Sequence, residues 1–143
     1  MASQLMGAAG LTATAPAAYY LGTGRLDSRA LILWTANWLF ACNQIHFVQL
    51  RIHATRAATL QEKFAQGKSF FLGQAVLLLA LALGTLSRMV VPLLIVAFLP
   101  GLVRGTMWFF QGQEPLDVKK LGWSEMRQGA AFAILLAIAF LFH

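Results

Sequence analysis

The chain has 143 residues, of which 59% are hydrophobic and 11% are charged, and its formal net charge is +6. This composition excludes an ordinary soluble domain, because a fold of this size could not hide so much apolar surface from water. The surplus of Lys and Arg does not indicate nucleic-acid binding, because these residues flank apolar segments and so indicate membrane topology and lipid-headgroup contacts. Cys42 is the single cysteine, which excludes an intramolecular disulfide and a cysteine-based metal cluster.

The apolar segments predict an all-α fold, a polytopic transmembrane helix bundle that forms one domain over residues 1–143. Five spans are expected, at about residues 4–22, 29–50, 69–87, 89–110 and 123–142, each near the roughly 20 residues that cross a bilayer. The first span is the least apolar, since it is rich in Ala and Gly and contains Pro16. No charge precedes Arg25, so this segment is expected to remain as a span and not to be cleaved as a signal peptide.

The second span is the most polar, and its polar residues are Asn37, Asn43, Gln44, His46 and Gln49. At about 100° per residue, Asn37 and Gln44 share one helix face with Arg51, whereas His46 and Gln49 share roughly the opposite face with His53. Polar groups on two faces predict two polar neighbours. Asn37, Gln44 and Gln49 are therefore expected at helix-packing or partner interfaces, where such side chains form interhelical hydrogen bonds.

The two histidines of this region also have a chemical interpretation. A neutral imidazole is a ready metal ligand, so His46 is a candidate axial ligand for haem or for the magnesium of a chlorophyll, with His53 as the second candidate. They lie two turns apart, too far to bind one metal ion without a third ligand. Interhelical hydrogen bonding is the alternative explanation for His46.

Between the second and third spans, RIHATRAATLQEKFAQGK places apolar Ile52, Ala57, Leu60 and Phe64 among basic residues. This pattern predicts an amphipathic segment at the cytoplasmic membrane surface. Basic residues concentrate here and after the fourth span; they are Arg51, Arg56, Lys63, Lys68, Arg104, Lys119 and Lys120, followed by Arg127. The other side has only Arg25, Arg29 and Arg88, so the positive-inside rule predicts a cytoplasmic N-terminus and an external C-terminus.

The last two spans carry small residues at four-residue spacing, namely Gly101 and Gly105 in the fourth span and Gly129, Ala133 and Ala137 in the fifth. Such spacing lets helix backbones approach closely, so these positions are expected at helix-packing or partner interfaces. Chance spacing is the alternative in a chain this rich in Ala and Gly. Pro92 and Pro100 are expected to kink the fourth span or to divide it, because proline lacks a backbone donor.

Two charges near the cytoplasmic ends of these spans form a further expected contact. Arg104 lies close to the end of the fourth span, and Glu125 lies at the beginning of the fifth. We expect an interfacial ion pair between them, with two separately solvated charges as the alternative.

The sequence has no recognisable catalytic motif. It lacks a GxSxG element, a glycine-rich phosphate loop and an HExxH element. Its two aspartates, Asp27 and Asp117, lie in loops far apart in the sequence, whereas prenyl transfer needs closely spaced carboxylates that hold Mg²⁺ against a diphosphate.

The segment LPGLVRGTMWFFQGQEPLDVKKLGWSEM, from Leu99 to Met126, resembles the C-terminal segment of the YwiC-like family of bacterial membrane proteins. The matching residues are Pro100, Arg104, Pro115, Leu116, Lys119, Lys120, Gly122 and Glu125. FVQLRI, from Phe47 to Ile52, resembles the end of an earlier span of that family. The likeness covers most of this chain and the C-terminal half of a typical family member. It implies a polytopic protein of the bacterial inner membrane and implies no particular reaction.

These observations favour a non-catalytic accessory or structural subunit of a larger membrane complex, with bound lipids and other membrane subunits as partners and no nucleic acid. Polar residues on two faces of one helix and close-packing small residues both require neighbours. One alternative is a cofactor-binding subunit that holds haem or chlorophyll through His46 or His53. Another is a protein that handles a prenyl or quinone lipid.

Overall fold

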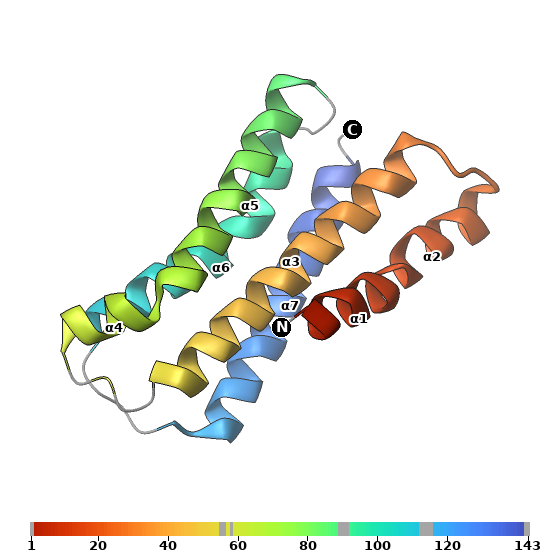
Figure 1. Cartoon of the computed structure of the whole chain (residues 1–143). Coiled ribbons are helices and arrows are strands. Elements are labelled where there is room, and N and C mark those ends of the chain that lie inside the picture. Colours follow the sequence, from red (N-terminus) through yellow and green to blue (C-terminus); the bar gives the residue numbers. More distant parts are fainter. Residues whose placement is uncertain (1, 55–56, 58, 89–91, 112–115, 142–143) are drawn as a thin grey trace. The chain divides into compact units, whose positions relative to one another are not determined.

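The computed structural model describes residues 2–54, 57, 59–88, 92–111 and 116–141. Every regular element among these residues is a helix, which confirms the all-α prediction for this part of the chain. The helices are α1 (Ala2–Thr12), α2 (Thr14–Thr23), α3 (Ser28–His53), α4 (Leu60–Gln66), α5 (Lys68–Leu86), α6 (Pro92–Phe110) and α7 (Val118–Leu141) (Figure 1). The chain divides into two compact units, residues 1–45 and 46–143, so α3 contributes to both.

The first predicted span contains two helices, α1 and α2, which meet at Ala13. Pro16 has no N–H to donate to the Thr12 carbonyl, and its ring crowds that carbonyl. At the junction, the Ala13 N–H donates to the carbonyl of Gly10, three residues earlier, at 3.2 Å. This turn is tighter than that of an α-helix. With 11 and 10 residues, each helix is by itself shorter than the roughly 17 residues that cross a bilayer.

Two tryptophans attach α1 to α3 in the unit of residues 1–45. The Trp34 indole N–H donates to the Ala9 carbonyl at 3.0 Å, and the Trp38 indole N–H donates to the Leu5 carbonyl at 3.1 Å. The later tryptophan contacts the earlier carbonyl, so α1 and α3 run antiparallel.

Asp27 caps the N-terminus of α3. Its Oδ1 accepts hydrogen bonds from the N–H groups of Arg29 at 3.0 Å and Ala30 at 3.3 Å, and its Oδ2 accepts one from the Tyr19 hydroxyl at 3.2 Å. Desolvation acts to raise the pKa of this carboxyl, but these three hydrogen bonds and the charge of Arg29 together hold the pKa below its ordinary value of 3.8.

Among the described residues, three helices are long and apolar enough to cross a membrane, and they are α5, α6 and α7. They have 19, 19 and 24 residues, or about 28, 28 and 36 Å of helical rise against a hydrocarbon layer of about 30 Å. They correspond to the third, fourth and fifth predicted spans. α3 is long enough, with 26 residues, but its Asn, Gln and His residues make it less apolar, and it is not among the three.

The ends of these helices differ in detail from the sequence prediction. α7 begins at Val118, earlier than the predicted residue 123, because Oδ1 of Asp117 accepts the N–H groups of Lys119 and Lys120 at 3.0 and 3.1 Å. Pro92 is the first residue of α6, where a missing N–H costs nothing. Pro100 lies inside α6, which continues to Phe110. Arg56, Pro115 and the predicted span residues 89–91 and 142 lie outside the described residues.

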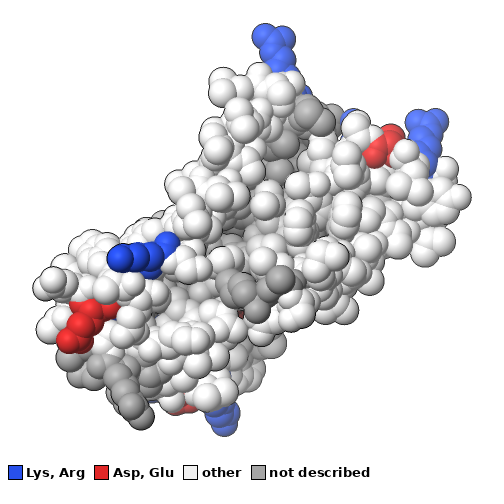
Figure 2. Space-filling model, in the orientation of Figure 1, with Lys and Arg blue, Asp and Glu red and all other residues white. Residues whose placement is uncertain are grey.

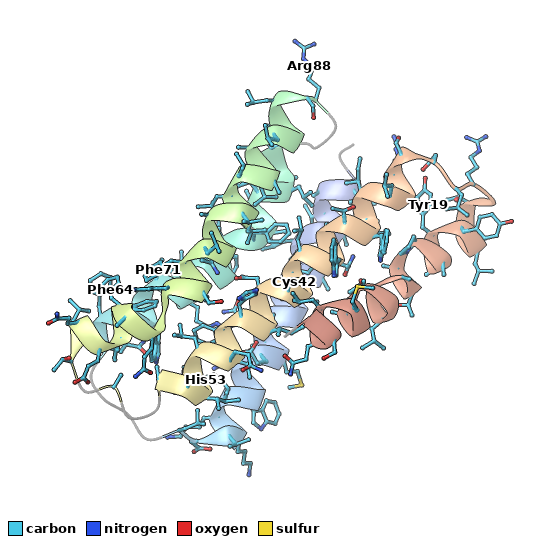
Figure 3. All side chains as sticks on the ribbon, in the orientation of Figure 1. Tyr19, Cys42, His53, Phe64, Phe71 and Arg88 are labelled. Carbon is cyan, nitrogen blue, oxygen red and sulfur yellow. The ribbon has the colours of Figure 1, made fainter. Side chains whose placement is uncertain are left out.

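Aromatic side chains from α4, α5 and α6 form a stack in the unit of residues 46–143. Ring centroids are 5.3 Å apart for Phe64 and Phe71, 5.2 Å for Phe64 and Phe109, and 4.6 Å for Phe71 and Phe109; Figure 3 shows Phe64 and Phe71 side by side. Gly67 is required here, since a Cβ on it would lie 2.7 Å from Cζ of Phe109. The stack holds α4 against the ends of the two neighbouring helices.

α4 is a short, well-capped helix. The Thr59 hydroxyl accepts the N–H of Glu62 at 3.2 Å, and the Glu62 carboxylate accepts the N–H of Thr59 at 3.3 Å. Leu60 and Phe64 are exposed, whereas Lys63 is buried with only 4% of its surface exposed. α4 lies within the predicted amphipathic segment, and Lys63 is turned into the protein.

Candidate functional site: a cleft along α6 and α7

A cleft of about 770 Å³ lies within the unit of residues 46–143. It is formed by the last turns of α3, the C-terminal half of α6 and the N-terminal half of α7. Its lining residues are Phe47, Arg51, Leu99, Pro100, Val103, Arg104, Met107, Trp108, Gln111, Asp117, Lys120, Leu121, Ser124 and Gln128. The volume falls within the range of about 300–1,000 Å³ that is usual for pockets that bind small molecules.

The character of the cleft changes along its length. Its lining extends from Leu99 on α6 to Gln111, the residue after the end of that helix, a separation of about 18 Å by helical rise. Around Gln111 the lining is charged, with Arg51, Asp117 and Lys120; we call this end the mouth. Around Leu99 the lining is mainly apolar, and the polar exception is Gln128, whose Oε1 is buried and accepts no hydrogen bond from the described residues.

Arg104 occupies the middle of the cleft and pairs with Glu125. Its Nη1 lies 2.6 Å from Oε1 and its Nη2 lies 3.3 Å from Oε2 of that carboxylate. Nη1 also donates to the Ser124 hydroxyl at 3.1 Å, and the guanidinium carbon lies 4.1 Å from the centroid of the Phe47 ring. The expected contact between Arg104 and Glu125 is thus present, and it neutralises the guanidinium inside a largely apolar surrounding.

Trp108 lies between two cationic side chains at the mouth. The Arg51 guanidinium carbon is 5.6 Å from the indole centroid, and Nζ of Lys63 is 4.7 Å from it. Both distances are within the roughly 6 Å at which a cation is attracted to an aromatic face. Arg51 lines the cleft, whereas the buried Lys63 is not among its lining residues.

Lys63 also caps the C-terminus of α6. Its Nζ donates to the carbonyl of Gln111 at 2.7 Å and to that of Trp108 at 3.5 Å. The last carbonyls of a helix have no intrahelical partner and carry partial negative charge, so a cation there is favourable. In the sequence, Lys63 is one of the basic residues that indicate membrane topology, and no signal in its neighbourhood indicates this burial.

His46 and His53, the candidate cofactor ligands, lie at different places. His46 is half-buried, and its ring faces Gly73 of α5, where a Cβ would lie 3.4 Å from Nδ1. His53 is exposed in the last turn of α3 (Figure 3), and its Nδ1–H donates to the Gln49 carbonyl at 2.7 Å. Within the described residues, no group of three or more His, Cys, Asp or Glu side chains is placed to hold a metal ion.

The predicted polar interface residues of α3 are all half-buried. Nδ2 of Asn37 donates to the Leu33 carbonyl of its own helix at 2.8 Å. Gln44 precedes the boundary between the two units, and Gln49 follows it. Their role at a helix-packing or partner interface remains a prediction.

The small residues of α6 and α7 are in contrasting surroundings. Gly101 and Gly105 are buried, and a Cβ on Gly105 would lie 2.5 Å from Cζ of Phe70 on α5. A Cβ on Gly129 would meet nothing within 4 Å, and Ala133 and Ala137 are exposed. The glycines of α6 thus face the chain's own helices, and the small residues of α7 lie on its surface.

Comparisons with known proteins give no further assignment, since no protein-family model, no curated protein and no solved structure matches this chain. Two carboxylates near the cleft, among the residues that the structure describes, have structural partners: Glu125 in the ion pair and Asp117 in the helix cap. The arrangement is therefore suited to binding an amphiphile, with charge at one end and apolar side chains at the other.

Proposed function

We propose that this chain is an accessory subunit of a larger membrane complex in the bacterial inner membrane and that the small-residue face of α7 receives a helix of a partner subunit. Here α7 is the fifth span, α1 with α2 and α3 supply the first two, the N-terminus is cytoplasmic and the C-terminus is external. α4 lies at the cytoplasmic surface with Leu60 and Phe64 toward the lipid. Membership of the YwiC-like family is part of the same proposal.

The observation that carries the proposal is a contrast between the outward faces of two helices. On α5 the outward residues are bulky, and Leu72, Val76, Leu79 and Leu83 are each more than half exposed. On α7 a strip of small residues at four-residue spacing, Gly129, Ala133 and Ala137, runs beside the exposed Ile134 and Ile138.

Both helices have the length and composition to cross the same bilayer, so lipid alone does not explain the difference. Bulky apolar side chains suit contact with acyl chains, whereas small residues allow the backbone of a second helix to approach. The other side of α7 buries Phe132, Leu136 and Ala139 within the chain. The small residues are consequently left for a helix from another molecule. Most of the surface visible in Figure 2 carries neither Lys, Arg, Asp nor Glu, which supports a location in lipid.

Gly129→Leu tests this proposal. The added side chain enters open space, so we expect the variant to insert and to unfold in detergent as the parent does. The partner helix is displaced, so proteins that co-purify with the parent from native membranes should be lost. Ala82→Leu is the matched control, because it adds similar bulk to an exposed position of α5, outside the small-residue face of α7.

Mass spectrometry of the material purified in mild detergent identifies the associated proteins. The proposal requires at least one protein that is retained by the parent and by Ala82→Leu but absent from Gly129→Leu. If the three preparations carry the same proteins, the small-residue face is not the interface. If Gly129→Leu aggregates, the face packs within this chain, and the proposal is also wrong.

A further inference from the structure

An apolar ridge forms the α6 wall of the cleft. Leu99, Val103 and Met107 follow one another at four-residue spacing and are 46%, 50% and 59% exposed. The ridge is about 12 Å long by helical rise. α6 is a helix of membrane-spanning length and composition, so in a bilayer this ridge faces the hydrocarbon layer. An acyl chain is the molecule that such a ridge accommodates without leaving polar groups unpaired.

The mouth provides positive charge at the end of this ridge. Arg51 comes from the last turn of α3 and Lys120 from the first turn of α7, and both line the cleft. Among the described lining residues, the carboxylate is that of Asp117, whose Oδ1 accepts two backbone N–H groups. Farther in, Glu125 neutralises Arg104. The mouth therefore presents two basic side chains, Arg51 and Lys120, next to an apolar groove. Basic pockets between membrane helices are typical binding sites for anionic headgroups.

We propose that the cleft binds one anionic phospholipid with a singly charged phosphodiester headgroup, such as phosphatidylglycerol. Its phosphate lies between Arg51 and Lys120, and one acyl chain lies along Leu99, Val103 and Met107. A peptide does not suit the site, because the ridge offers no donors or acceptors to its backbone.

The test uses the full-length protein in detergent, incubated with equal amounts of phosphatidylglycerol and phosphatidylcholine, and native mass spectrometry measures which lipid is retained. Lys120→Gln should lower the preference for phosphatidylglycerol about fivefold, the effect of one basic residue near a headgroup. Lys119→Gln is the matched control. Lys119 is exposed, it also donates its N–H to Asp117, and it does not line the cleft.

A second pair of variants tests the acyl-chain groove. Val103→Trp fills the ridge and should abolish retention of the lipid. Val96→Trp places the same ring on an exposed position of α6 outside the cleft and should leave retention unchanged. Both valines are more than a third exposed, so neither substitution disturbs the buried core.

The results discriminate between the site and general attraction. Equal losses in Lys119→Gln and Lys120→Gln would mean that the basic end of the molecule attracts anionic lipid without a defined site, which overturns the proposal. Equal retention of phosphatidylcholine by the parent would overturn the headgroup assignment. Suppose that inorganic phosphate displaces the lipid and that Val103→Trp still retains the lipid. The site then binds the phosphate group without an acyl chain in the groove, and the lipid is the wrong ligand.

Discussion

The ion pair between Arg104 and Glu125 should couple the stabilities of α6 and α7, and a double-mutant cycle measures this coupling. The two side chains are 16% and 22% exposed, between the limits of a surface pair and a buried pair. Surface pairs contribute about 0–1 kcal/mol, and breaking a buried pair costs about 3–5 kcal/mol. A bidentate pair in this intermediate surrounding should therefore have a coupling energy of about 2 kcal/mol.

The structure also predicts that the two single substitutions are unequal. Glu125→Gln loses the ion pair and should cost about 2 kcal/mol. Arg104→Gln loses the same pair, the hydrogen bond to Ser124 and the contact with the Phe47 ring, so it should cost about 1 kcal/mol more. The double variant should be less destabilised than the sum of the two by about the coupling energy.

Unfolding of the purified protein in mixed micelles, induced by increasing denaturing detergent and followed by circular dichroism, gives the four free energies of unfolding. Arg127→Gln is the control, because Arg127 is an exposed charge on α7, the helix of Glu125. It should change stability by less than about 0.5 kcal/mol. Strictly additive losses in the double variant would refute the reasoning, because they would mean that the two charges act independently.

Two further substitutions test the helix caps. Lys63→Met leaves the α6 carbonyls without their cation and should destabilise the protein by about 2 kcal/mol. Lys68→Met, at an exposed position, is the control and should change stability by less than about 0.5 kcal/mol. Equal stability of the two variants in the same unfolding assay would show that desolvation of Lys63 cancels the cap. Because folding lowers the pKa of Asp27, its cap is fully effective above the ordinary pKa of 3.8 and is lost as the pH falls below that value through the folded-state pKa. Unfolding midpoints from neutral to strongly acidic pH should therefore decrease more in the parent than in Asp27→Asn, and parallel curves would contradict this assignment.

Local features of the sequence were sufficient for the helical class and for the three membrane-length helices. A continuous apolar segment of about 20 residues has one favourable arrangement in lipid, because its backbone groups must pair within the segment. The third predicted span, 69–87, differs from α5 by one residue at each end. The pairing of Arg104 with Glu125 was also predictable. Arg104 lies near the end of the fourth span and Glu125 at the beginning of the fifth, and a charge at the edge of the membrane has few other partners.

Tertiary packing decided what periodicity leaves open, namely which face of each helix meets which neighbour. Lys63 and Lys68 are equivalent in the sequence, yet one is buried as the cap of α6 and the other is exposed. Gly105 and Gly129 belong to the same spacing pattern, yet one lies against Phe70 and the other faces open space. The cleft likewise depends on residues from α3, α6 and α7 that are far apart in the chain. Apolar length and helix capping are local properties, whereas burial and close approach depend on contacts between distant segments, so the sequence determined the helices and the tertiary structure determined their surroundings.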